Sequence, residues 1–112
     1  MINHIKMKEA EFYGIKVQVE DVPLGFYVFR NPDVPSEDLV YGERDVSFFE
    51  GIAKQVPRDD FIETLKQMIK CTKVAIEDGV VDIISPENRE HNFKALRNTE
   101  KTLTKILDAL SK

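Results

Sequence analysis

Residues 57–77 read PRDDFIETLKQMIKCTKVAIE, and this stretch decides the fold class. Its large apolar residues recur every third or fourth position, so at 100° per residue they share one face of a helix. Pro57 suits the first helical turn, and the two aspartates that follow match the positive end of the helix dipole. Gly79, just past the stretch, is typical of a helix end. We therefore predict an amphipathic helix over residues 57–78.

A second stretch with the same spacing follows. Ser85 and Pro86 are typical of a helix start, with serine as the cap and proline at the first helical position. The apolar stripe that follows consists of Phe93, Leu96, Leu103, Ile106, Leu107 and Leu110. We predict a second helix over residues 86–111, antiparallel to the first because the connection between them is short. The apolar link at residues 80–84 favours one more short strand.

The apolar pattern before the first helix has a different period. In the stretch 12–20, Ile15, Val17 and Val19 alternate with polar residues, as in a strand with one face in water. A turn rich in Pro and Gly follows, and then the aromatic run at residues 26–29, which suits a second strand. Together these features predict a β-hairpin between the two strands.

The remaining N-terminal residues are less periodic. Two prolines and several polar residues predict a loop over 31–38, and residues 39–41 favour a short strand ending at Gly42. We favour another strand from Val46 to about residue 56, because Gly51 is a poor helix residue. A short helix over residues 45–54 is the competing interpretation.

These elements predict one α+β domain over residues 1–112. An N-terminal antiparallel sheet of three to five short strands, within about residues 12–56, precedes two C-terminal amphipathic antiparallel helices. The length of 112 residues, 42% hydrophobic and 32% charged, is ordinary for one folded domain.

The net charge and the lack of targeting signals limit the kinds of partner that we expect for this chain. The formal net charge is −4, which argues against nucleic-acid binding over the whole surface. The N-terminus lacks the apolar run of a signal peptide, and no stretch approaches the ~20 apolar residues of a membrane span. A single cysteine excludes an internal disulfide. We therefore expect a cytoplasmic protein without a membrane partner.

A row of cations lies on the last predicted helix. On a helical wheel four basic residues fall within about 80°, nearly opposite the apolar stripe. They are Lys94, Arg97, Lys101 and Lys105. Such a row can hold phosphates or an acidic partner, or can be a solvated face. The only aromatic residues beyond position 49, Phe61 and Phe93, point to the core side, so this region lacks a stacking surface for single strands.

Along the same predicted helix, six residues follow one another at intervals of three, four, three, four and three positions. They are Phe93, Leu96, Glu100, Leu103, Leu107 and Leu110. This seam can bind a partner helix or a second copy, or it can pack on the first helix. A thin sheet with one helical pair often leaves an apolar face uncovered, and the aromatic residues at 26, 27, 29, 48 and 49 offer such a face. We therefore predict a homo-oligomer, dimeric or larger.

Two polar residues lie near the start of the same helix, on its apolar side. With the free N–H groups of the helix start, Arg89 and Asn92 can hold an anion or a small polar ligand. The alternative is that they bond to loop carbonyls.

No motif points to catalysis, a metal or a cofactor. The two histidines, His4 and His91, have no metal-ligand spacing to each other or to Cys71. Cys71 falls at the edge of the predicted buried face, so packing is favoured over nucleophilic chemistry. The acidic residues around the helix connection fit a solvated corner; they are Glu77, Asp78, Asp82, Glu87 and Glu90.

The sequence favours a non-catalytic binding or adaptor protein that acts through protein–protein contacts and self-associates, with a small anionic ligand as an additional possibility. A nucleic-acid-associated accessory protein is the alternative, and a small enzyme is the third hypothesis.

Overall fold

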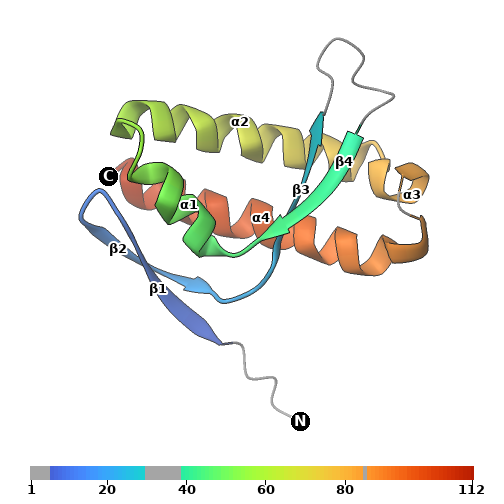
Figure 1. The fold of residues 1–112 in the computed structure, drawn as a ribbon, viewed down its shortest axis with the longest axis horizontal. Helices are drawn as coiled ribbons and strands as arrows, with labels where there is room; N and C mark the ends of the chain where they lie inside the picture. Colours follow the sequence, from blue (N-terminus) through green and yellow to red (C-terminus); the bar gives the residue numbers. More distant parts are fainter. Residues whose placement is uncertain (1–5, 30–38, 85) are drawn as a thin grey trace.

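A computed structural model describes residues 6–29, 39–84 and 86–112 (Figure 1). The chain is α+β. Its elements are β1 (Met7–Phe12), β2 (Ile15–Glu20), β3 (Leu24–Phe29), β4 (Leu39–Arg44), α1 (Val46–Ala53), α2 (Arg58–Glu77), α3 (Val80–Ile84), a 3-10 turn (Pro86–Asn88) and α4 (Arg89–Leu110). The predicted class and number of strands are confirmed, but the strands form two antiparallel pairs, β1–β2 and β3–β4, and not one sheet. The predicted loop at 31–38 and the Ser85 cap lie outside the described residues.

The predicted hairpin between residues 12–20 and 26–29 is wrong. The hairpin is β1–β2, joined by the two residues Tyr13 and Gly14, whose φ angles are 53° and 81°. Two left-handed residues in succession match the right-handed twist of paired strands, so they form the preferred two-residue turn. Tyr13 tolerates this backbone because its hydroxyl donates to the carbonyl of Val56 (2.8 Å) and its ring packs on Phe61.

The strand predicted from Val46 to about residue 56 is also wrong, and the competing helix is correct. In α1 the residues Val46, Phe49 and Ala53 are buried, at the three- and four-residue spacing of one helical face. Gly51 lies on the open side of this helix, where a Cβ would meet nothing within 4 Å. The buried face therefore outweighs the low helix propensity of a single glycine.

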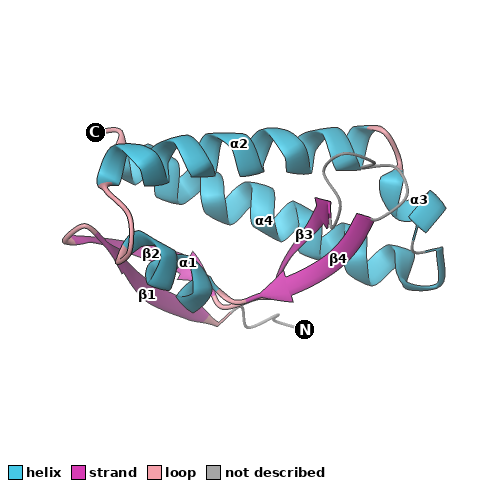
Figure 2. Ribbon diagram, turned by 45° about the horizontal axis from the view of Figure 1, so that its top comes forward, coloured by secondary structure: helices cyan, strands magenta, loops and turns pink. Residues whose placement is uncertain are grey.

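The two long helices are confirmed in part. The helix predicted over 57–78 is α2, and the one predicted over 86–111 is α4 preceded by the 3-10 turn. They pack antiparallel along each other (Figure 2). The strand favoured at residues 80–84 is wrong, because this link is the short helix α3. Gly79 ends the preceding helix with a φ of 67°, a left-handed conformation that favours glycine.

The hydrophobic core lies where β1, β2 and α1 meet the first half of α2 and the second half of α4. Its largest fully buried side chains include Phe12, Phe49, Phe61, Leu65, Leu103, Ile106 and Leu110. The rings of Phe12 and Phe61 stack with centroids 5.5 Å apart. Arg58, at the start of α2, donates to the carbonyl of Leu110 and so satisfies a free carbonyl at the end of α4.

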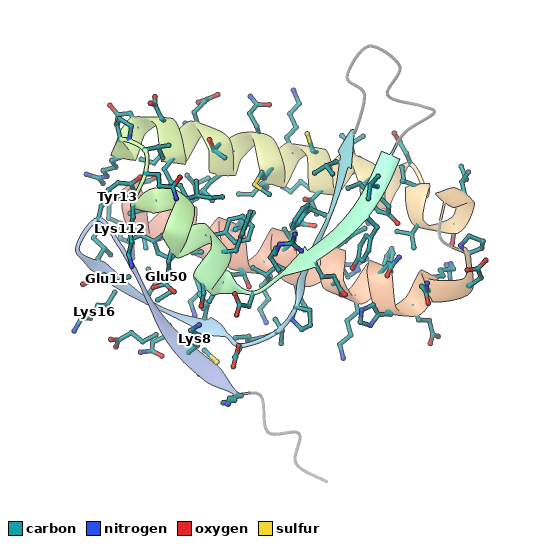
Figure 3. All side chains as sticks on the ribbon, in the orientation of Figure 1. Lys8, Glu11, Tyr13, Lys16, Glu50 and Lys112 are labelled. Atoms are coloured by element: carbon teal, nitrogen blue, oxygen red, sulfur yellow. The ribbon has the colours of Figure 1, made fainter. Side chains whose placement is uncertain are left out.

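The outer edge of β1 is covered by α1 (Figure 3). The Glu50 carboxylate accepts a hydrogen bond from the backbone N–H of Glu11 (3.1 Å), and the Lys8 ammonium donates to the Ser47 hydroxyl. An uncovered edge strand offers its N–H and C=O groups to other chains. The helix therefore protects this edge against unspecific strand pairing.

Candidate functional site

The four cations predicted to form one row are divided between two shallow depressions on α4. Lys94 and Arg97 line the first together with Arg89, beside the ring of Phe93. The Arg97 guanidinium lies 4.7 Å from the centroid of that ring. Their charge is partly balanced, because Glu90 lines the same depression.

Lys101 and Lys105 line the second depression, next to β2. The Lys101 ammonium lies 2.6 Å from the Glu20 carboxylate, which ties α4 to the end of β2. Lys101 is therefore part of an ion pair within the chain, and the row is less strongly charged than its sequence indicates. An exposed pair of this kind contributes little to stability.

The side chains of Arg89 and Asn92 lie in different environments. The exposed guanidinium of Arg89 is paired with the carboxylate of Asp82 on α3, whereas Asn92 is buried on the inner face of α4. Arg89 is therefore placed to bind α3 to the start of α4. The loop-carbonyl alternative is not observed for Arg89, whose partner is a carboxylate.

The heptad-like seam of α4 packs largely inside the chain. Leu96, Leu103 and Leu110 are almost completely buried, whereas Phe93 and Leu107 are half-buried. Leu103 and Leu110 belong to the hydrophobic core with residues of α2. Of the two interpretations of the seam, the intramolecular one therefore accounts for its central leucines.

An exposed apolar surface lies instead on α1 and β3. Phe48 is 42% exposed and Val28 46% exposed. The Phe48 ring stacks on Phe26 of β3, with centroids 6.5 Å apart and planes 17° from parallel. The Arg44 guanidinium lies 5.7 Å from the centre of the Phe48 ring. Aromatic residues, phenylalanine included, and arginine are enriched in protein–protein interfaces relative to the rest of the surface.

A cavity continues this surface between β3 and α2. Its volume is about 170 Å³, and its walls are mostly apolar. Phe26 and Val28 form one side, Met68 and Cys71 form the other, and Leu96 of α4 lies among the lining residues. We call the residues Phe26, Val28, Phe48, Met68 and Cys71 the apolar strip.

The exposure of Cys71 corrects the packing role expected from the sequence. The thiol is exposed and lines the cavity. On a helical wheel Cys71 lies at one margin of the buried arc of α2, and the β3–β4 sheet does not close over that margin. Phe48 and Phe49 were both expected on an uncovered aromatic face, but only Phe48 is exposed, because Phe49 lies on the buried side of α1.

A polar group of side chains lies between β4 and α4. The Nε2 atom of His91 lies 2.6 Å from a carboxylate oxygen of Glu43. The hydroxyl oxygen of the nearby Tyr41 is buried. Burial, followed by the negative charge of Glu43, raises the pKa of Tyr41 above its ordinary value of 10.0. Sequence reasoning missed this group because its members are 48 residues apart.

Among the described residues, no three His, Cys, Asp or Glu side chains are grouped to hold a metal ion. No helix in the described ranges has the length and apolarity needed to span a bilayer. Comparison of the chain with models of known protein families, with curated proteins and with solved structures found no match.

Proposed function

We propose that the chain is a non-catalytic protein-binding domain that self-associates through the apolar strip. The single observation that carries the proposal is the exposed Phe48 ring, stacked on the half-buried Phe26 next to an open apolar cavity. Monomeric proteins rarely leave large contiguous apolar surface in water, because covering it is favourable by roughly 25 cal/mol per Å².

A second copy of the chain is the occupant that fits best. An interface between identical copies with two-fold symmetry must match itself. The five strip residues are uncharged, so two strips can meet without desolvating a charge. At the α1 end the exposed side chains of Arg44 and Asp45 carry opposite charges. A two-fold axis near Phe48 brings Arg44 of one copy towards Asp45 of the other.

The shape of the molecule also suits a face-to-face dimer. Its principal extents are 44 × 39 × 20 Å, so it is flat and its broad faces are large compared with its thickness. A stable interface buries about 800 Å² on each partner, which is a part of one such face.

Sedimentation equilibrium over a range of concentrations tests the proposal. We expect the wild-type chain to dimerise, and we expect Phe48→Ser and Val28→Ser each to weaken association about tenfold or more. Ile83→Ser is the matched control, because Ile83 is 78% exposed and lies outside the strip. A wild-type chain that stays monomeric, or a control that weakens association as much as Phe48→Ser, would overturn the proposal.

A charge swap separates a second copy from a different protein partner. Arg44→Asp should weaken the dimer because it places like charges together, and adding Asp45→Arg should restore it. Circular dichroism checks that each variant keeps its fold. A double variant that remains as weak as Arg44→Asp would exclude the symmetric contact.

A nucleic-acid-associated accessory role is the second candidate. The observation in its favour is that Arg89, Lys94 and Arg97 line one depression beside an aromatic ring. It predicts salt-dependent binding that is lost on reversing the charges of Lys94 and Arg97. Absence of binding by the wild-type chain at low salt would end this candidate.

A further inference from the structure

The cavity between β3 and α2 has the size of one aromatic ring. Its volume is about 170 Å³, and an apolar cavity of about 150 Å³ is large enough to bind benzene. None of the residues that line it carries a charge. The Thr72 hydroxyl in its wall donates to the carbonyl of Met68 in the same helix (2.7 Å). The cavity therefore suits an apolar group about as large as a phenyl ring and offers little to a charged ligand.

The same surface presents a phenyl ring to the solvent. Phe48 is the most exposed of the aromatic side chains whose exposure the structure describes. Its ring stacks on Phe26, which also lines the cavity, whereas Phe48 itself does not line it. The ring and the cavity are therefore neighbours on one face of the molecule, and each leaves apolar surface in contact with water.

Two-fold symmetry makes these two neighbours complementary. In an interface between identical copies, a residue i of one copy that contacts residue j of the other implies the reverse contact as well. An axis that passes between Phe48 and the mouth of the cavity therefore places the ring of each copy at the cavity of the other. Such a pair is closed, because both rings and both cavities are used and neither is left to extend a filament.

We infer that the two copies exchange rings, so that Phe48 of each copy fills the cavity of the other. The inference rests on the proposed function and names the contact within the apolar strip on which association depends. Val28 and Cys71 lie on opposite sides of the cavity and would flank the incoming ring. Arg44 and Asp45 precede Phe48 closely and carry opposite charges, so the same axis also brings unlike charges together.

Filling the cavity tests the exchange while the surface stays apolar. Cys71 is exposed and lines the cavity, so Cys71→Trp places a large ring there without disturbing the core. We expect association to weaken about tenfold or more, because the ring of the second copy no longer fits. Val74→Trp is the matched control, since Val74 is 47% exposed on the same helix and does not line the cavity. Sedimentation equilibrium measures association, and circular dichroism checks the fold of each variant.

Mixing two variants tests whether the contact is reciprocal. Phe48→Ala removes the ring and keeps the cavity, whereas Cys71→Trp keeps the ring and fills the cavity. Each variant alone should associate about tenfold or more weakly than wild type. An equimolar mixture should associate more tightly than either, because the Phe48 ring of one variant enters the open cavity of the other. In the second half of that interface, the shortened side chain of Phe48→Ala faces the filled cavity without a clash.

The outcomes separate the exchange of rings from the proposed function. A dimer that Phe48→Ala weakens and Cys71→Trp leaves unchanged or tightens would support association through the strip and overturn the exchange. A mixture no tighter than its components, or a Val74→Trp control as weak as Cys71→Trp, would overturn the exchange too. A wild-type chain that is monomeric at every concentration would refute self-association, and the exchange with it.

Discussion

β3 and α4 approach each other closely at Gly25. A Cβ at this position would lie 2.4 Å from the Tyr41 hydroxyl oxygen and 2.8 Å from the Cβ of Ala95. Because one neighbour is a short side chain fixed on a helix, the clash cannot be relieved by a change of rotamer alone. Only glycine permits this close approach of β3 to α4.

Substitution of two glycines tests this account of Gly25. Gly25→Ala should lower the free energy of unfolding by about 1–3 kcal/mol, as overpacking does. Gly51→Ala should raise it by about 0.5–1 kcal/mol, because alanine suits a helix better and the site is open. Urea unfolding measures both. A neutral Gly25→Ala would contradict the close approach.

The Tyr41 hydroxyl gives the chain a specific sensitivity to alkali. Its pKa is raised in the folded state by burial and by Glu43, so below pH 10 the hydroxyl is neutral in both states. Above that pH the unfolded chain loses the proton first, and the folded state is therefore progressively destabilised. Wild type should lose more stability than Tyr41→Phe between pH 9 and pH 11. Parallel pH profiles for the two proteins would show that the hydroxyl is not buried.

At the scale of elements, the α2–α4 pair holds the stable part of the molecule together. Leu103→Ala should lower the free energy of unfolding by about 2–5 kcal/mol, because it opens a cavity in the core. Leu107→Ala, on the half-buried side of the same helix, should cost clearly less. If the seam packs within the chain, both effects are independent of protein concentration. A Leu103→Ala effect that appears only at high concentration would place the seam between chains.

The long helices were predictable, since each repeats its apolar spacing over many turns. The strand pairing was not, because the left-handed turn at Tyr13 and Gly14 carries no proline and only one glycine. The predictions for the short elements were wrong for a different reason. Eight residues in α1 and five in α3 are too few for the apolar period to distinguish helix from strand, so tertiary contacts decide.

The candidate site was predictable only in its chemistry. An uncovered aromatic face was expected from the aromatic residues of the N-terminal half, and Phe26 and Phe48 belong to it. Phe49 does not, because it is completely buried. The cavity and the position of Cys71 depend on how β3 lies across α2, a contact between segments about 45 residues apart that no local pattern encodes.

At the scale of the whole molecule, the main hydrophobic core joins β1, β2 and α1 to parts of both long helices, and the β3–β4 sheet packs mainly on α4. The apolar strip draws its residues from β3, α1 and α2. Association through the strip would therefore bury side chains from three different elements at once.

The reactivity of Cys71 tests the central claim most directly, since its thiol lies in the strip and is the only one in the chain. The rate of reaction with a thiol reagent is measured at constant pH across about a hundredfold range of protein concentration. We predict that the rate constant falls as wild type associates and stays at its high monomer value in Phe48→Ser. A wild-type rate constant that does not change while the chain dimerises would place the interface elsewhere.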